Sequence, residues 1–354
     1  MAVADSGGVR IAVIGAGHWG PNLIRNFHNH PRSSVTWVVD TNAKRLAQVA
    51  ERYAGVDTTA DASVALAADN VDAVVIASPT TTHYGLAKEA LGRRKHVLVE
   101  KPLTADVAEG AELCAMAADA GVVLMVGHVF LYNQGVERVK RYLDAGELGD
   151  VYYLSMTRTN LGPIRTDVNA AWDLAAHDVS IANYWMDRSP EAVSATGASW
   201  INPGIEDAVF ATLRYPGGVL AHLHASWLNP RKSRDITVVG ERRMLTLDDM
   251  NLGEPIRIYD KGVVDETTTG RFVDTFASFR ASVREGDITI PNVSLGEPLS
   301  AECDHFVSCV ADGLPSRTDG EFGLAVVQTL EALQRSLAEG GREVSLLEAT
   351  EAAS

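Results

Sequence analysis

Residues 9–20 read VRIAVIGAGHWG, and this stretch decides the fold. An apolar strand over residues 11–14 runs into Gly15-Ala16-Gly17-His18-Trp19-Gly20, which fits the G-x-G-x-x-G pattern of dinucleotide-binding turns. Gly15 permits a sharp turn, Gly17 lets a pyrophosphate approach the backbone, and Gly20 lets the next helix lie close to the strand. Glycine turns are common in α/β proteins, so a flavodoxin-like turn is the alternative.

The residues after this turn favour a Rossmann fold. Leu23, Ile24 and Phe27 have helical spacing, and a second strand over residues 35–39 ends on Asp40. A carboxylate at this position accepts hydrogen bonds from the adenosine ribose and repels a 2′-phosphate, so we expect NAD as the cofactor. NADP stays open as the alternative, because Lys44 and Arg45 follow closely and offer positive charge to a phosphate.

The alternation of strands and helices continues to residue 126. Apolar strands over residues 71–77, 96–99 and 122–126 are typical of a parallel sheet whose two faces are covered by helices. Ligands of such sheets bind at the carboxyl ends of the strands, which here carry Ser78-Pro79 and Glu100-Lys101-Pro102. The sequence therefore predicts an α/β fold with a Rossmann dinucleotide-binding domain over residues 1–127.

From residue 128 the pattern changes. Helices are expected over residues 133–145 and 172–186, with a strand over 151–157 and a polar loop over 158–169 between them. Short strands with turn glycines over residues 192–247 suggest hairpins. Two helices over residues 299–312 and 323–339 close the chain. We expect an α+β domain over residues 128–354 with an open, mostly antiparallel sheet.

The composition is that of an ordinary globular protein, with 46% hydrophobic and 22% charged residues among 354. The net charge of −15 disfavours nucleic acid as a partner.

No apolar run reaches membrane-spanning length, and the start, MAVADSGG, has no basic region followed by an apolar one, so a cytoplasmic protein is expected. Three cysteines without a C-x-x-C pair indicate neither a disulfide framework nor a zinc site. His222 and His224 lack a third ligand nearby, so packing or a sheet interface is expected there, and no metal.

Two clusters are candidates for chemistry. Lys101, at a strand end, can polarise a carbonyl, or lose a proton if burial and a positive nicotinamide lower its pKa. Asp173 and His177 are spaced i and i+4 and share one helical face, which suits His177 as general acid and base for a hydroxyl–ketone pair. The alternatives are a surface lysine and a structural histidine.

Taken together and in this order, GAGHWG, Asp40, Glu100-Lys101-Pro102 and the Asp173-x-x-x-His177 helix resemble the Gfo/Idh/MocA oxidoreductase family over about residues 9–344. The resemblance implies an NAD(P)-dependent enzyme that acts on CH–OH groups. Lys101 would hydrogen-bond the reacting oxygen, His177 would be the acid and base, and Asp173 would support both. It also implies that the last helices pack on the first domain and that a dimer or tetramer forms through the free face of the second sheet. Cofactor contacts would come from Gly15, Gly17, His18, Trp19, Gly20, Asp40, Ser78, Pro79, His83, Glu100 and Lys101.

Some positions depart from the family's usual pattern, and they weigh against free inositol or glucose. Ala175 stands where the family usually has glycine, and Phe130 and Leu131 replace basic residues of many polyol-oxidising relatives. Arginines beside the Asp173 helix suit a pyrophosphate, although they can also be solvated loop charges. This segment also resembles relatives associated with nucleotide-sugar and polysaccharide biosynthesis, and that resemblance implies a nucleotide-sugar that is oxidised or reduced at a ring carbon, often the 3-position. A free-sugar or cyclitol dehydrogenase, or a non-catalytic NAD-binding sensor or scaffold, stays open. The residues expected at the substrate are Lys101, Arg158, Asn160, Arg165, Asn169, Trp172 and His177.

Overall fold

The computed structural model describes residues 8–263, 283–294 and 296–346. The chain forms two compact units: the first comprises Met1–Tyr132 and Gly296–Glu331, the second Asn133–Leu295 and Ala332–Ser354. The first boundary lies after Tyr132, beyond the predicted residue 127, because the short helix η2 (Val129–Tyr132) packs against α9 (Pro298–Asp312). Among the helices of the described ranges, none combines the length and the apolar character that a membrane span requires.

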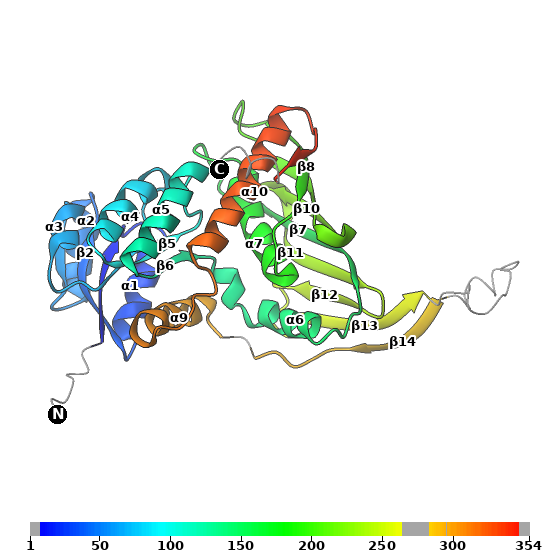
Figure 1. Ribbon diagram of the computed structural model, residues 1–354, viewed down its shortest axis with the longest axis horizontal. Helices are drawn as coiled ribbons and strands as arrows, with labels where there is room; N and C mark the ends of the chain where they lie inside the picture. Colours follow the sequence, from blue (N-terminus) through cyan, green and yellow to red (C-terminus); the bar gives the residue numbers. More distant parts are fainter. Residues whose placement is uncertain (1–7, 264–282, 295, 347–354) are drawn as a thin grey trace, which may run out of the picture. The chain divides into compact units, whose positions relative to one another are not determined.

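The first unit is a Rossmann domain, with a six-stranded parallel sheet in the order β3-β2-β1-β4-β5-β6. Helices lie on both faces of this sheet (Figure 1), so the central strands β1 and β4 are buried almost throughout. The predicted doubly wound fold is confirmed. The strands are β1 (Val9–Ile14), β2 (Ser33–Val39), β3 (Asp57–Thr59), β4 (Ala73–Ile76), β5 (His96–Glu100) and β6 (Leu124–Gly127), and the helices between them are α1 (Gly20–Asn29), α2 (Ala43–Arg52), α3 (Ala62–Ala67), η1 (Thr80–Thr82), α4 (His83–Gly92) and α5 (Val107–Ala120).

Helix α9 belongs to this first unit although it follows the whole second sheet in the sequence. Phe306 of α9 meets Phe27 of α1 edge to face, with ring centroids 6.1 Å apart. Arg32 makes an ion pair with Asp312 at 2.8 Å, which ties the turn after α1 to the end of α9. Residues 298–312 therefore complete the packing around α1.

The second unit is built on a nine-stranded sheet in the order β14-β13-β12-β11-β7-β10-β9-β8-β15. Only the pair of β7 and β10 is parallel among the described pairings, so the predicted mostly antiparallel sheet is confirmed. The strands are β7 (Val151–Leu161), β8 (Ala192–Ala198), β9 (Ala208–Arg214), β10 (Leu220–Ser226), β11 (Leu228–Gly240), β12 (Met244–Asp248), β13 (Ile256–Val263), β14 (Val283–Thr289) and β15 (Val344–Ser345).

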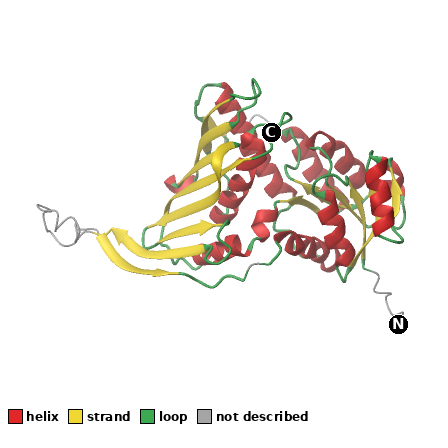
Figure 2. Cartoon of the chain, turned by 180° about the vertical axis from the view of Figure 1, so that it is seen from behind, coloured by secondary structure: helices red, strands yellow, loops and turns green. Residues whose placement is uncertain are grey.

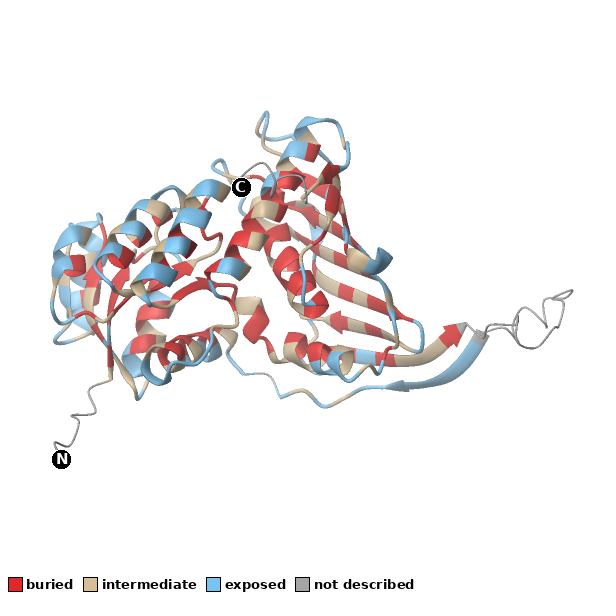
Figure 3. Ribbon diagram, in the orientation of Figure 1, coloured by how far each residue is buried: buried red, intermediate tan, exposed pale blue. Residues whose placement is uncertain are grey.

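The helices α6 (Gln134–Asp144) and α7 (Ala176–Met186) cover one face of this sheet, and Figure 2 shows the other face without a covering helix. Buried residues alternate with more exposed ones along the strands (Figure 3). In β10, for example, Ala221 and Leu223 are buried while Leu220 and His222 are exposed. The last long helix, α10 (Gly320–Ala338), contributes residues to both units.

Two segments near the candidate site differ from the sequence prediction. Strand β7 continues to Leu161, so residues 158–161 are not in a loop, because β10 and β11 pair with Thr159 from its two sides. The helix expected from residue 172 begins as a π-helical turn over Ala171–Ala175 and becomes α-helical only at Ala176. Such turns are rare and often occur at functional sites.

Candidate active site

The glycine turn has the geometry that a dinucleotide needs. Gly15 has φ +100°, and a Cβ there would lie 2.6 Å from the carbonyl oxygen of Ala77, while a Cβ on Gly20 would collide with the carbonyl oxygen of Gly15. A Cβ on Gly17 would meet only Arg45 Nη1, 3.9 Å away. The fold itself thus requires glycine at positions 15 and 20, whereas at 17 glycine leaves the backbone accessible to a ligand.

The N-terminus of α1 fits the phosphates of a dinucleotide. The N-cap residue Trp19 makes no side-chain hydrogen bond to the first turn, and Pro21 occupies the start of the helix. Backbone N–H groups at such a terminus suit an anion. The rings of His18 and Trp19 are exposed and meet edge to face, with centroids 6.0 Å apart.

Asp40 lies at the carboxyl end of β2 and joins it to the glycine turn. Its Oδ2 accepts the backbone N–H of Ala16 at 2.8 Å, and its Oδ1 accepts that of Asn42 at 2.7 Å. Arg45 Nη1 lies 3.4 Å from Oδ2. A carboxylate has about four acceptor positions, so Asp40 keeps capacity for a ribose hydroxyl, while Arg45 supplies a cation at the same place.

His83 has a different position from the one expected for a cofactor ligand. The side chain is buried, with Nδ1 2.9 Å from the carbonyl oxygen of Pro102 and Nε2 3.0 Å from that of Ser78. Burial lowers the pKa of His83, against the opposing effect of these backbone contacts. The predicted cofactor contact of His83 is corrected: the ring connects the residues after β4 with those after β5. Ser78 and Pro79 lead into η1, where Ser78 Oγ lies 2.6 Å from Thr82 Oγ1.

Glu100 and Lys101 stand at the carboxyl end of β5. The Glu100 carboxylate lies over Gly127 of β6, where a Cβ would be 3.2 Å from Oε2. Burial raises the pKa of Glu100 to about 7, and the charge of Lys101 opposes this shift. Burial, followed by the charge of Lys101, lowers the pKa of His128 to about 3, so His128 is neutral at physiological pH. Lys101 is half-buried among these groups.

In the second unit, Asp173 is held in place from two sides. Its Oδ1 accepts from Arg165 Nη1 at 3.2 Å, and its Oδ2 accepts the indole N–H of Trp227 at 3.0 Å. Trp172, Asp173 and His177 are all half-buried. The structure thus brings Arg165 to the helix of Asp173 and His177, as the sequence predicted for this arginine. Sequence reasoning missed Trp227, because no local pattern connects it with a partner 54 positions away.

The expected substrate contact of Asn169 is corrected. Its amide donates to Glu206 Oε2 at 2.6 Å and to Gln334 Oε1 at 2.7 Å, and its Oδ1 accepts the N–H of Trp172 at 3.2 Å. The side chain is buried. Asn169 therefore caps the π-helical turn and fixes its start, because every polar atom of its amide is used within the protein.

The expected substrate contact of Arg158 is corrected as well. Its Nε and Nη2 donate to Asp178 Oδ1 at 3.0 and 2.8 Å, and the two side chains are 5% and 3% exposed. Since Asp178 follows His177 directly, this ion pair fixes the start of α7 on β7. Asn160, also in β7, is half-buried, and its amide lies over Gly162.

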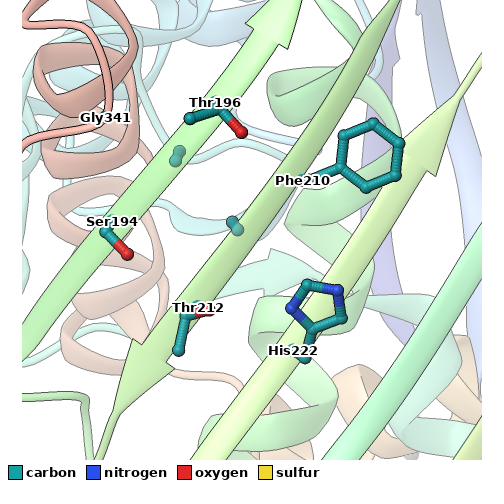
Figure 4. A pocket seen from close by; sticks show the side chains of 8 residues that line it. Ser194, Thr196, Phe210, Thr212, His222 and Gly341 are labelled. Carbon is teal, nitrogen blue, oxygen red and sulfur yellow. The ribbon is translucent and has the colours of Figure 1, made fainter.

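A shallow hollow lies on the open face of the second sheet, the face opposite α6 and α7. Figure 4 shows its lining, with Ser194, Thr196, Phe210, Thr212, His222 and Gly341 labelled. The ring of His224 stacks on Phe210 with centroids 4.5 Å apart. Within residues 8–263, 283–294 and 296–346, no three His, Cys, Asp or Glu side chains are placed to hold a metal ion.

Comparison with known proteins matches a family model to a part of each unit. Residues 9–128 match the family model described as "Oxidoreductase family, NAD-binding Rossmann fold", and residues 136–246 match the GFO/IDH/MocA C-terminal domain. The chain is 28% identical over 323 residues to UDP-N-acetylglucosamine 3-dehydrogenase of Acidithiobacillus ferrooxidans, covering 90% of this chain and 94% of that protein. A crystal structure of that dehydrogenase aligns with a TM-score of 0.79 at 26% identity, over 94% of this chain and 98% of the other.

Two further relatives have a slightly higher percent identity. Inositol 2-dehydrogenase 2 of Paenarthrobacter aurescens is 31% identical over 264 residues, which cover 69% of this chain and 76% of that protein. The crystal structure of an oxidoreductase from Magnetospirillum magnetotacticum is 31% identical with a TM-score of 0.78, over 92% of this chain and 99% of the other. The chain belongs to the GFO/IDH/MocA oxidoreductase family, with an NAD(P)-binding Rossmann domain.

Proposed function

We propose that this protein transfers a hydride between NAD and the secondary hydroxyl or ketone of a nucleotide-sugar, at the 3-position of the sugar ring. The observation that carries this proposal is the match along 94% of UDP-N-acetylglucosamine 3-dehydrogenase. Arg165 supports it, because a half-exposed guanidinium beside Asp173 suits a pyrophosphate.

In the oxidation direction, His177 accepts the proton of the reacting hydroxyl. Lys101 donates a hydrogen bond to the same oxygen and stabilises the charge that develops there. Trp227 and Arg165 keep the Asp173 carboxylate oriented on the helix that carries His177. NAD, when bound, supplies the hydride acceptor. The glycine turn of residues 15–20, the N-terminus of α1 and Asp40 are the groups that would hold it.

A cyclitol dehydrogenase is the second candidate, favoured by the 31% identity with inositol 2-dehydrogenase 2. Under that function Arg165 has no phosphate to bind. A non-catalytic NAD-binding sensor would need the glycines and Asp40 but would have no use for Lys101 and His177.

The test is the absorbance of reduced nicotinamide. The protein is mixed with NAD or NADP and a panel of UDP-, dTDP- and GDP-sugars, beside free sugars and inositols. We expect turnover with nucleotide-sugars, a loss of at least a hundredfold in His177→Ala, and a raised KM in Arg165→Ala. Arg231→Ala is the matched control, because Arg231 is 76% exposed and lies on β11. Turnover with free polyols, unchanged in Arg165→Ala, would establish the second candidate.

A further inference from the structure

Helix α9 carries a buried carboxyl group that the proposed reaction does not use. Glu302 is 0% exposed, on the same buried face as Leu299, Cys303 and Phe306. In the described part of the chain, neither Oε1 nor Oε2 of Glu302 has a hydrogen-bond partner. An ionised carboxylate without partners is very costly inside a protein, so Glu302 carries a proton at neutral pH.

Glu302 interacts with Glu100, the residue before Lys101. Burial raises the pKa of Glu302 well above its ordinary value, and the charge of Glu100 raises it further. Helix α9 contacts η2, and η2 follows β6 closely in the sequence. The Glu100 carboxylate lies over Gly127 of β6, so α9 and Glu100 meet at the end of this strand. We call Glu100 and Glu302 the carboxyl pair.

If both glutamates of the carboxyl pair were ionised, the groups around them would not neutralise the second negative charge. His128 is buried and uncharged, and burial together with Glu302 keeps Tyr132 and Cys303 protonated by raising the pKa of each. Arg317 lies over the ring of Tyr132, and Arg25 is paired with Glu297 at the exposed end of α9. The charge of Lys101 acts on Glu100 and favours its ionised form. Lys101 directly follows the carboxyl end of β5, and Rossmann folds bind their ligands at such strand ends.

We propose that the carboxyl pair releases a proton when oxidised NAD binds and keeps it when NADH binds. Glu302 acts through Glu100 in this proposal, so it is a positioning residue. This inference rests on the proposed function, because it needs a nicotinamide at the end of β5. The oxidised ring is positive and the reduced ring is neutral, and a positive charge nearby favours the ionised form of a carboxyl.

The protons balance over the reaction. Binding of NAD+ liberates one proton from the carboxyl pair to solvent. Oxidation would then move a hydride with two electrons from carbon to nicotinamide, while His177 would accept the hydroxyl proton and pass it to solvent. The carboxyl pair regains a proton once the ring is neutral. By linkage, the affinity for NAD+ rises with pH relative to that for NADH.

Titration calorimetry on the full chain tests this inference. NAD+ and NADH are titrated at one pH in buffers of different ionisation enthalpy, so that the heat reports the protons exchanged. We expect NAD+ to release more protons than NADH, by up to one per site. We also expect the ratio of the Kd of NADH to that of NAD+ to rise by up to about tenfold per pH unit. Glutamine has nearly the shape of glutamate but no titrating proton, so Glu302→Gln should reduce both the difference in proton release and the pH dependence of the Kd ratio. Glu51→Gln is the control, because Glu51 is exposed on α2, and it should change neither.

Two outcomes separate this inference from the proposed function. Binding of both nucleotides with equal proton release in the unmodified protein and in Glu302→Gln would overturn the inference alone, whereas failure to bind either nucleotide would overturn both. Carboxyl carbon-13 NMR of the unliganded protein gives a check without any nucleotide. We expect a glutamate signal that titrates above the usual 4.5, is missing in Glu302→Gln, and titrates lower in Glu100→Gln. A Glu302 signal with an ordinary midpoint would also overturn the inference.

Discussion

Gly17 and Gly20 belong to one motif, but they are glycines for different physical reasons. A Cβ at position 20 would collide with backbone, whereas a Cβ at position 17 would enter open space beside Arg45. We expect Gly20→Ala to lower the free energy of unfolding by about 1–3 kcal/mol. Gly17→Ala should keep the stability and weaken NAD+ binding at least tenfold, about 1.4 kcal/mol.

Urea unfolding and calorimetry of both variants measure the two effects separately. An equal loss of stability in Gly17→Ala would show that position 17 is restricted by the fold and not by the ligand.

His128 makes the free energy of unfolding of the first unit depend on pH. Its pKa is about 3 in the folded protein, because of burial and then the charge of Lys101, against 6.5 for an ordinary histidine. Between these values the unfolded chain binds more protons, so stability rises with pH, by up to about 1.4 kcal/mol per unit. His128→Gln should flatten this rise in urea unfolding between pH 4.5 and 6.5, whereas His28→Gln, exposed on α1, should not. Equal slopes in all three proteins would contradict the assignment.

At the scale of elements, the contact of β7 with α7 separates two arginines that look alike in the sequence. Arg158 is buried against Asp178, whereas the side chain of Arg165 is 39% exposed beside Asp167 and Asp173. Arg158→Ala leaves Asp178 buried without its partner, so we expect a loss of about 3–5 kcal/mol of stability. Arg165→Ala should cost less than about 1 kcal/mol.

Denaturant midpoints for Arg158→Ala and Arg165→Ala, at unchanged m-value, provide the comparison. A stable Arg158→Ala variant with a raised KM for nucleotide-sugars would instead return Arg158 to the substrate site.

The same elements show what the sequence was able to predict. The Rossmann sheet follows from local signals, because buried parallel strands are continuously apolar and the turn glycines sit at fixed spacing. The extension of β7 through residues 158–161 has no such signal, since its polar residues become strand only through pairing with β10 and β11. Asn169 looked like a ligand residue because the sequence does not show Glu206 and Gln334, which occupy its amide.

At the scale of the whole molecule, the open face of the second sheet carries large apolar side chains. Tyr153 is 45% exposed, Phe210 is 44% exposed and Leu220 is 38% exposed, on three adjoining strands. Exposed apolar area of this kind is typical of an interface between subunits. Burial, and then the charge of His222, lower the pKa of His224 beside Phe210, which favours the uncharged form of His224.

We expect a homodimer or homotetramer that forms through this face. Phe210→Asp should then dissociate it, because assembly would bury an unpaired carboxylate. Light scattering coupled to size-exclusion chromatography should give a multiple of 37.9 kDa for the unmodified chain and 37.9 kDa for the variant. Leu314→Asp is the control, since Leu314 is 49% exposed and belongs to the first unit, not to the unit that carries this sheet. An unmodified chain that runs as a monomer, or a Phe210→Asp variant that stays assembled, would rule this face out as the interface.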